Sequence, residues 1–152
     1  MSQCVIRPAT RDDVPAVVAL LADDPLGAGR EDPGDTEVYD TAYDRVAADP
    51  AQHLVVAERD GRVVGTLQLS VIPGLSRRGA TRSVIEGVRV ARGERGSGLG
   101  TELVAWAVEE SRRLGCSLVQ LTSDASRVDA RRFYERLGFV ASHVGFKLQL
   151  GD

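Results

Sequence analysis

Several residue types that would point to particular functions are scarce in this 152-residue chain. The two cysteines, Cys4 and Cys116, form no CxxC pair, so a zinc site or a redox motif has no support. No apolar run is long enough to cross a bilayer, and the first residues lack the basic and apolar regions of a signal peptide. We therefore expect a cytoplasmic protein that makes no membrane contact and binds no metal.

Net charge is also small, but it is unevenly distributed. The formal net charge is −3, which argues against general binding to nucleic acid. Residues 23 to 49 nevertheless carry nine acidic side chains against two arginines. A solvated surface explains such a segment. The alternative is an acidic rim that attracts a cationic substrate.

The apolar patterns predict one domain, residues 1–152, of mixed α/β class. The predicted order is β-α-α-β-β-β-α-β-α-β. Strands are expected at residues 4–9, in a hairpin at 53–74 that turns at Asp60-Gly61, and at 81–91, 117–124 and 143–150. Helices are expected at residues 10–22, 36–49, 98–114 and 127–138, with a loop at 23–35. The run at 117–124 is continuously apolar, which predicts burial on both faces.

Residues 92–103, RGERGSGLGTEL, place four glycines directly ahead of an apolar helical stripe. A GxGxxG fingerprint fails because Thr101 replaces the third glycine, and a Walker A loop fails because the only lysine is Lys147. Free N–H groups at a helix N-terminus attract anions, and Arg92 and Arg95 add positive charge. We interpret the stretch as a cradle for a diphosphate rather than a linker, because the helix begins at once.

Two motifs resemble those of the GNAT superfamily of N-acetyltransferases. Arg95-Gly-Ser-Gly-Leu-Gly100 is similar to the acetyl-CoA motif R/Q-x-x-G-x-G/A, and DARRFYERLGF, residues 129–139, is similar to A-x-x-F/L-Y-x-x-x-G-F. The resemblance implies a twisted, mostly antiparallel sheet flanked by helices, with acetyl-CoA as cosubstrate. The cosubstrate contacts that it implies are Val88, Arg89, Val90, Arg95, Gly96, Ser97, Gly98, Leu99, Gly100 and Thr101. Many members carry an asparagine where this chain has Ser126-Arg127, which leaves Ser126 to offer a smaller hydrogen bond to the pantetheine arm.

Acetyl transfer to an amine needs a base, an oxyanion site and an acid for the departing thiolate. Glu86 lies in an apolar strand, where partial desolvation would favour the neutral form of a carboxyl group, and the resemblance implies a base there, acting directly or through a water. The resemblance also assigns backbone N–H groups of Val88 to Val90 to the oxyanion. The phenol of Tyr134 is placed as the general acid, with Phe133 and Phe139 in the core. The alternatives are a solvent-facing or ion-paired glutamate and a tyrosine that only packs.

The leading hypothesis is an N-acetyltransferase that transfers an acetyl group from acetyl-CoA to a primary amine of a small molecule or peptide. If the acidic segment forms the substrate rim, that amine is cationic. One rival is a non-catalytic acyl-CoA-binding or regulatory module on the same fold, and another is a nucleotide-binding protein that uses the glycine loop. The sequence leaves open the identity of the acceptor and whether two copies form a homodimer.

Overall fold

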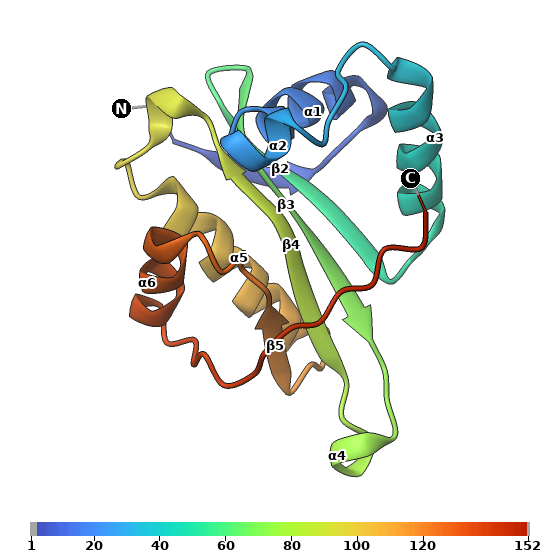
Figure 1. Cartoon of the computed structure of the whole chain (residues 1–152), viewed down its shortest axis with the longest axis vertical. Helices are drawn as coiled ribbons and strands as arrows, with labels where there is room; N and C mark the ends of the chain where they lie inside the picture. Colours follow the sequence, from blue (N-terminus) through green and yellow to red (C-terminus); the bar gives the residue numbers. More distant parts are fainter. Residues whose placement is uncertain (1–2, 152) are drawn as a thin grey trace. The chain divides into compact units, whose positions relative to one another are not determined.

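The computed structural model describes residues 3–151, and the chain divides into two compact units, one ending at Gln120 and the other beginning at Leu121. A five-stranded sheet has the strand order β1-β2-β3-β4-β5, and the pairs from β1 to β4 are antiparallel (Figure 1). The strands are β1 (Val5–Pro8), β2 (Gln52–Arg59), β3 (Arg62–Ile72), β4 (Arg82–Val90) and β5 (Leu118–Leu121).

The helices of the first unit follow the predicted order, with two short additions. They are α1 (Val14–Ala22), α2 (Pro25–Ala28), α3 (Thr36–Ala48), α4 (Ser76–Gly79) and α5 (Leu99–Arg113), together with single 3₁₀ turns at Arg11–Asp13 and Arg92–Glu94. The second unit contains α6 (Val128–Arg136). The predicted mixed α/β class is confirmed.

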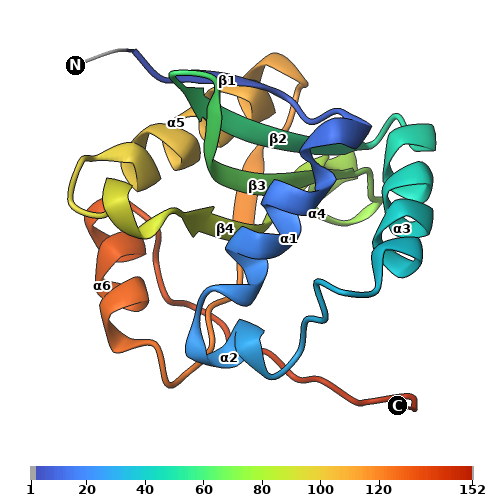
Figure 2. The ribbon, with the colours of Figure 1, turned by 90° about the horizontal axis from the view of Figure 1, so that it is seen from above.

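Helices α1 and α5 lie on opposite faces of the sheet (Figure 2). On the α5 face, the hydroxyl groups of Ser83 and Ser111 lie 2.7 Å apart in the buried interface. Leu103 of α5 is fully buried, and Val17 of α1 is 6% exposed. Both residues belong to stripes spaced three and four positions apart, the pattern that predicts an amphipathic helix. The sheet between the two helices therefore holds the core of this unit.

The turn before α1 is held by a buried carboxylate. Asp13 is 8% exposed, and its carboxylate accepts hydrogen bonds from the Arg7 guanidinium at 2.7 and 3.0 Å and from the Thr10 backbone N–H at 2.7 Å. Arg7 also donates to Glu58 at 2.7 Å. The hydrogen bonds from Arg7, more than those from Thr10, lower the pKa of Asp13 to about 2. This carboxylate therefore joins β1, the helix entry and β2.

Asp13→Asn is expected to destabilise the protein at neutral pH by about 2 kcal/mol, because the lowered pKa of the wild-type carboxyl group stabilises the folded state. That contribution is complete above the unfolded-state pKa of 3.8 and is lost as the pH falls toward about 2. Urea unfolding of both proteins across this range should show the difference shrinking with acid. Asp12→Asn, at the exposed neighbouring position, serves as the control, and a difference that is constant with pH would contradict the assignment.

The predicted loop at residues 23–35 contains the short helix α2, which the pattern did not indicate. Asp24 caps it by accepting a hydrogen bond from the Gly27 backbone N–H, and Pro25 occupies its first turn. Proline fixes a helical φ and needs no partner for its nitrogen at that position. The Asp24-Pro25 pair is therefore a helix-start signal within a segment whose composition predicted only a loop.

Strand β5 is not buried on both faces as predicted. Its residues alternate between exposed and half-buried, because β5 is the last strand in the sheet order rather than an internal one. A continuous apolar run reports hydrophobicity, but it does not report the position of a strand within a sheet.

The predicted strand at residues 143–150 is wrong, since no strand is formed there in the described part of the chain. The alternating apolar side chains of this segment are exposed, and Phe146 is 93% exposed. Alternation predicts which side chains share a face, whereas a strand also requires a partner backbone. Within residues 3–151, no helix has the length and apolar character required to span a membrane.

Candidate active site

Strand β4 carries a bulge in its centre. Gln68 of β3 pairs with Glu86, whereas Thr66 pairs with Arg89, so β4 has one more residue than β3 over this interval. Gly87 lies within it and has a φ of 62°, a left-handed conformation that glycine adopts without steric cost. A bulge interrupts the regular hydrogen-bond ladder. The predicted oxyanion donors, Val88 to Val90, therefore follow directly after a break in strand pairing.

Glu86 precedes this bulge, and its surroundings differ from the expectation. The residue is exposed, as is Gly87, so the expected partial burial of the carboxylate is wrong. The neighbour nearest to Gly87 is Leu21 of α1, whose Cδ2 would lie 3.6 Å from a Cβ at that position. Glycine adds no side chain that could shield its neighbour.

Glu86 also lines a cavity of about 140 Å³ between α1 and the sheet. Most of the lining is apolar; the residues are Val17, Leu21, Leu54, Thr66, Leu67, Gln68, Glu86 and Gly87. The buried Thr66 hydroxyl donates to the Val55 carbonyl at 2.8 Å. Gln68 and Glu86 are consequently the side chains that give this cavity its polar character.

Gln68 was not identified from the sequence. The sequence does show a polar residue between Leu67 and Leu69, both of which are fully buried. Because side chains alternate between the two faces of a strand, this pattern indicates only that Gln68 lies on the opposite face of the sheet from the two leucines. Its pairing with Glu86 depends on the register of β3 against β4, which the local pattern does not specify.

The glycine loop is formed as predicted. Gly96 and Gly98 have φ angles of 84° and 89°, and apart from the adjoining backbone no atom of the described chain lies within 4 Å of where a Cβ would stand at either position. Helix α5 begins directly after Gly98, with Leu99 buried at 1% exposure. The first N–H groups of a helix have no intrahelical partner. The loop therefore has the open space and the helix N-terminus that a diphosphate cradle requires.

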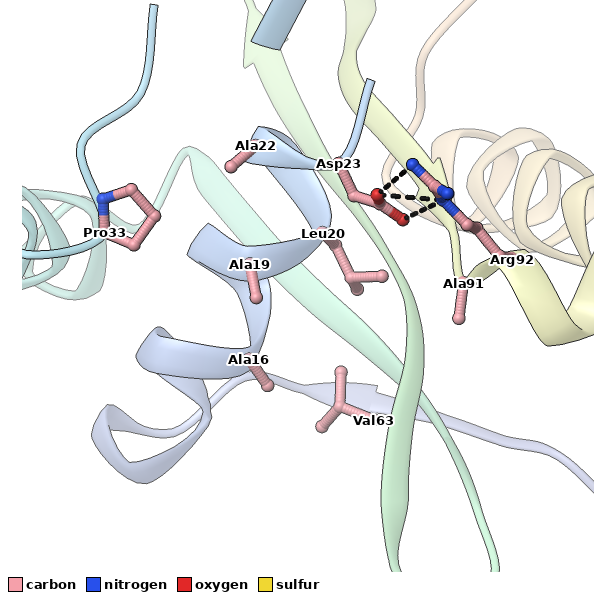
Figure 3. Close-up of a pocket in the computed structure, with 9 residues that line it drawn as sticks. All are labelled: Ala16, Ala19, Leu20, Ala22, Asp23, Pro33, Val63, Ala91 and Arg92. Atoms are coloured by element: carbon pink, nitrogen blue, oxygen red, sulfur yellow. Dashed lines mark hydrogen bonds and ion pairs between the residues drawn. The ribbon is translucent and has the colours of Figure 1, made fainter. Parts of the chain in front are cut away.

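Two acidic residues at the end of α1 bind arginines near this loop. Asp23 accepts from Arg92 at 2.9 and 3.0 Å, and the Asp24 carboxylate lies 3.0 Å from the Nε of Arg89. The Asp23–Arg92 pair lies at the edge of an open, largely apolar pocket of about 550 Å³ beside α1 (Figure 3). The positive charge that Arg92 was expected to bring to the glycine loop is thus balanced by Asp23.

The second unit holds Tyr134 on α6. Its half-buried ring contacts Phe133 and Phe139 edge-on, with ring centroids 5.1 and 5.9 Å away. These two phenylalanines are half-buried rather than in a closed core. Gly138, with a φ of 97°, ends the helix as predicted.

Ser126 is also in the second unit. Its hydroxyl donates to the Asp124 carboxylate at 2.6 Å, and its backbone N–H donates to the same oxygen at 2.9 Å. These hydrogen bonds lower the pKa of Asp124. The hydroxyl proton of Ser126 is therefore directed to Asp124, while the oxygen lone pairs stay available as acceptors.

The predicted site residues consequently fall into two groups. Glu86, the bulge residues and the glycine loop belong to the first unit, whereas Ser126 and Tyr134 belong to the second. Across residues 3–151, no group of three or more histidine, cysteine, aspartate or glutamate side chains is arranged to hold a metal ion.

Known proteins resemble this chain in sequence and in fold. Aminoalkylphosphonate N-acetyltransferase of Salmonella typhimurium is 33% identical over 146 residues, 96% of this chain and 91% of that protein. Glucosamine 6-phosphate N-acetyltransferase of Trypanosoma brucei brucei is 39% identical over 90 residues, 59% of each chain. The crystal structure of a transcriptional regulator from Bacillus halodurans C-125 has a TM-score of 0.94 and 43% identity, covering 97% of this chain and 100% of that one.

The sequence model of the acetyltransferase (GNAT) family matches residues 15–139. This range includes both motifs on which the resemblance depends. The chain therefore belongs to the GNAT family of acetyl-CoA-dependent acetyltransferases.

Proposed function

We propose that this protein is a cytoplasmic, single-domain N-acetyltransferase that acetylates the primary amine of a small molecule, with Glu86 as general base and Tyr134 as general acid. The observation that carries the proposal is the position of Glu86. Its side chain lines a small, largely apolar cavity and directly precedes the bulge at Gly87. A base and a set of backbone N–H donors are thereby neighbours on one strand.

The glycine loop and β4 provide the proposed binding surface for acetyl-CoA. Residues 95–101 would hold the diphosphate on backbone N–H groups, since nothing fills the space above Gly96 and Gly98. Val88 to Val90 would face the thioester, and Ser126 would accept a hydrogen bond from the pantetheine arm. The exposed Arg95 would add charge, because Arg92 is paired with Asp23.

In the proposed reaction, Glu86 removes a proton from the acceptor amine, directly or through a water. The amine nitrogen forms a bond to the acetyl carbon, and the carbon–sulfur bond of the thioester breaks. Backbone N–H groups after the bulge stabilise the oxyanion, an effect typically worth about 3 kcal/mol per donor. Tyr134 supplies a proton to the departing sulfur.

Gly98→Asp should weaken acetyl-CoA binding by at least about tenfold, or about 1.4 kcal/mol, because a carboxylate would enter the diphosphate cradle. Gly98 has a φ of 89°, so any side chain strains the backbone there. Gly98→Asn is the matched control, since it adds the same size and strain without the charge, and its loss should be clearly smaller. Calorimetric titration measures both, and equal losses for the two variants would contradict a site for an anion.

The acceptor is proposed to be an amine, but the acidic segment supports a cationic acceptor less than the sequence suggested. Asp35 caps α3 by accepting from the Val38 N–H, and Asp40 and Asp44 both pair with Arg11. Asp23 and Asp24 are also paired. These charges contribute to the structure and offer less free negative potential to a substrate. A cationic amine is accordingly only one of the acceptor classes that the experiment below compares.

A screen for release of the CoA thiol with a panel of amines tests the proposed function. The panel contains an aminoalkylphosphonate and an amino sugar phosphate, because the two N-acetyltransferase relatives are named for such compounds, and also a polyamine and an amino acid. Turnover of at least one is expected. Tight acetyl-CoA binding without turnover of any amine would favour a regulatory acyl-CoA-binding module. Light scattering of the same sample tests whether two copies form a homodimer, which the sequence leaves open.

A further inference from the structure

A short chain of polar side chains crosses from β2 to β3 on the cavity face of the sheet. The Ser70 hydroxyl donates to the Gln52 side-chain oxygen at 2.7 Å, and the Gln68 amide donates to the same oxygen at 2.9 Å. Gln52 pairs with Ser70 in the β2–β3 register. All three residues are half-buried. The two hydrogen bonds restrict the Gln68 carboxamide, which would otherwise sample several rotamers.

The chain ends beside the proposed base. Gln68 and Glu86 are paired residues on β3 and β4, and such pairs project from the same face with Cβ atoms about 4.5–5.5 Å apart. Both side chains line the cavity of about 140 Å³. The Thr66 hydroxyl, which also lines the cavity, donates its hydrogen bond to a backbone carbonyl. The Gln68 carboxamide and the Glu86 carboxylate are therefore the polar groups that this mainly apolar cavity offers to a ligand.

We propose that Gln68 is a positioning residue that hydrogen-bonds the acceptor amine beside Glu86, with the Gln52–Ser70 pair holding its carboxamide in place. This inference rests on the proposed function. A glutamine side chain has an oxygen acceptor and two N–H donors, and the bond to Gln52 uses one donor. The oxygen is left to accept one N–H of the amine while Glu86 takes another proton. Two hydrogen bonds at one nitrogen would orient its lone pair for attack.

The experiment compares Gln68→Leu, Gln52→Leu and the double variant. Gln68→Leu should raise the KM for the acceptor amine by about tenfold and leave the acetyl-CoA affinity unchanged. Gln52→Leu should raise the same KM by less, because Gln68 is present but less restrained. The double variant should match Gln68→Leu, since the two residues act through one side chain. Gln68→Met, which preserves side-chain length, replaces Gln68→Leu if the leucine variant does not fold.

Three results would overturn the inference. The first is an unchanged acceptor KM in a folded Gln68 variant, and the second is additive effects of the two substitutions. The third is an equal loss of acetyl-CoA affinity, which would indicate general damage to the site. Failure of the proposed function is distinguishable, because it would appear as no turnover of any amine by the wild type, or, for the assigned base, as full turnover in Glu86→Gln, whatever the behaviour of Gln68.

Discussion

Glu86→Gln should lower kcat by about 10²-fold or more while leaving acetyl-CoA affinity nearly unchanged. The substitution preserves the size of the side chain at the edge of the cavity and removes its ability to accept a proton. The residual rate of the variant should depend on pH only through the ionisation of the free amine.

A matched substitution controls for the loss of one negative charge. Glu109→Gln alters an exposed glutamate of α5 that pairs with Arg112 on the same helix, and exposed pairs of this kind contribute little to stability. Its kinetics should be those of the wild type. If Glu86→Gln retained the wild-type pH–rate profile, Glu86 would not be the base, and the proposed mechanism would lose its central residue.

Tyr134→Phe should lower kcat by about 10-fold to 10³-fold if proton donation to the departing thiolate limits the rate. Only the hydroxyl group is removed, so the edge contacts of the ring with Phe133 and Phe139 should persist. Thermal unfolding should therefore change little. An acetyl thioester with a more acidic thiol needs less assistance on departure, and the variant should lose less activity with that donor.

The control for this substitution is Tyr43→Phe. Tyr43 donates a hydrogen bond to the Ala9 carbonyl at 3.3 Å, and this contact joins α3 to the segment after β1. A small change in stability without a change in kcat is expected. Wild-type turnover in Tyr134→Phe would reduce Tyr134 to a packing role and would leave the departing thiolate without an assigned acid.

The glycine loop is a feature that could be predicted from a few consecutive residues. Gly96 and Gly98 were expected to admit an anion because they lack side chains, and both have the positive φ that disfavours other residues. Leu99 begins an apolar stripe that requires a helix to bury it. Each step depends on a few consecutive residues, so no knowledge of distant contacts was needed. The hairpin turn at Asp60-Gly61 was predictable for the same reason.

The exposure of Glu86 is a property that its neighbouring residues did not predict. Its place in an apolar strand suggested partial burial, yet Glu86 and Gly87, which lie at the bulge, are both exposed. The sequence contains the glycine, but a bulge is defined by a mismatch in count between two strands. That mismatch depends on how β4 is aligned with β3, and the pattern along β4 alone does not specify the alignment.

By itself, the sequence determined the order of the strands and of the longer helices up to α6, the glycine loop ahead of α5 and the resemblance to the family, because helical periodicity, turn residues and short motifs act over a few neighbouring positions. Only the tertiary structure decided the partners of Glu86 and Gln68 and the pairing of Arg92 with Asp23. It also decided that residues 143–150 form no strand in the described chain. The physical reason is that register, ion pairs between distant residues and strand pairing each require two segments to meet. The residue pattern of one segment does not specify which other segment will pair with it.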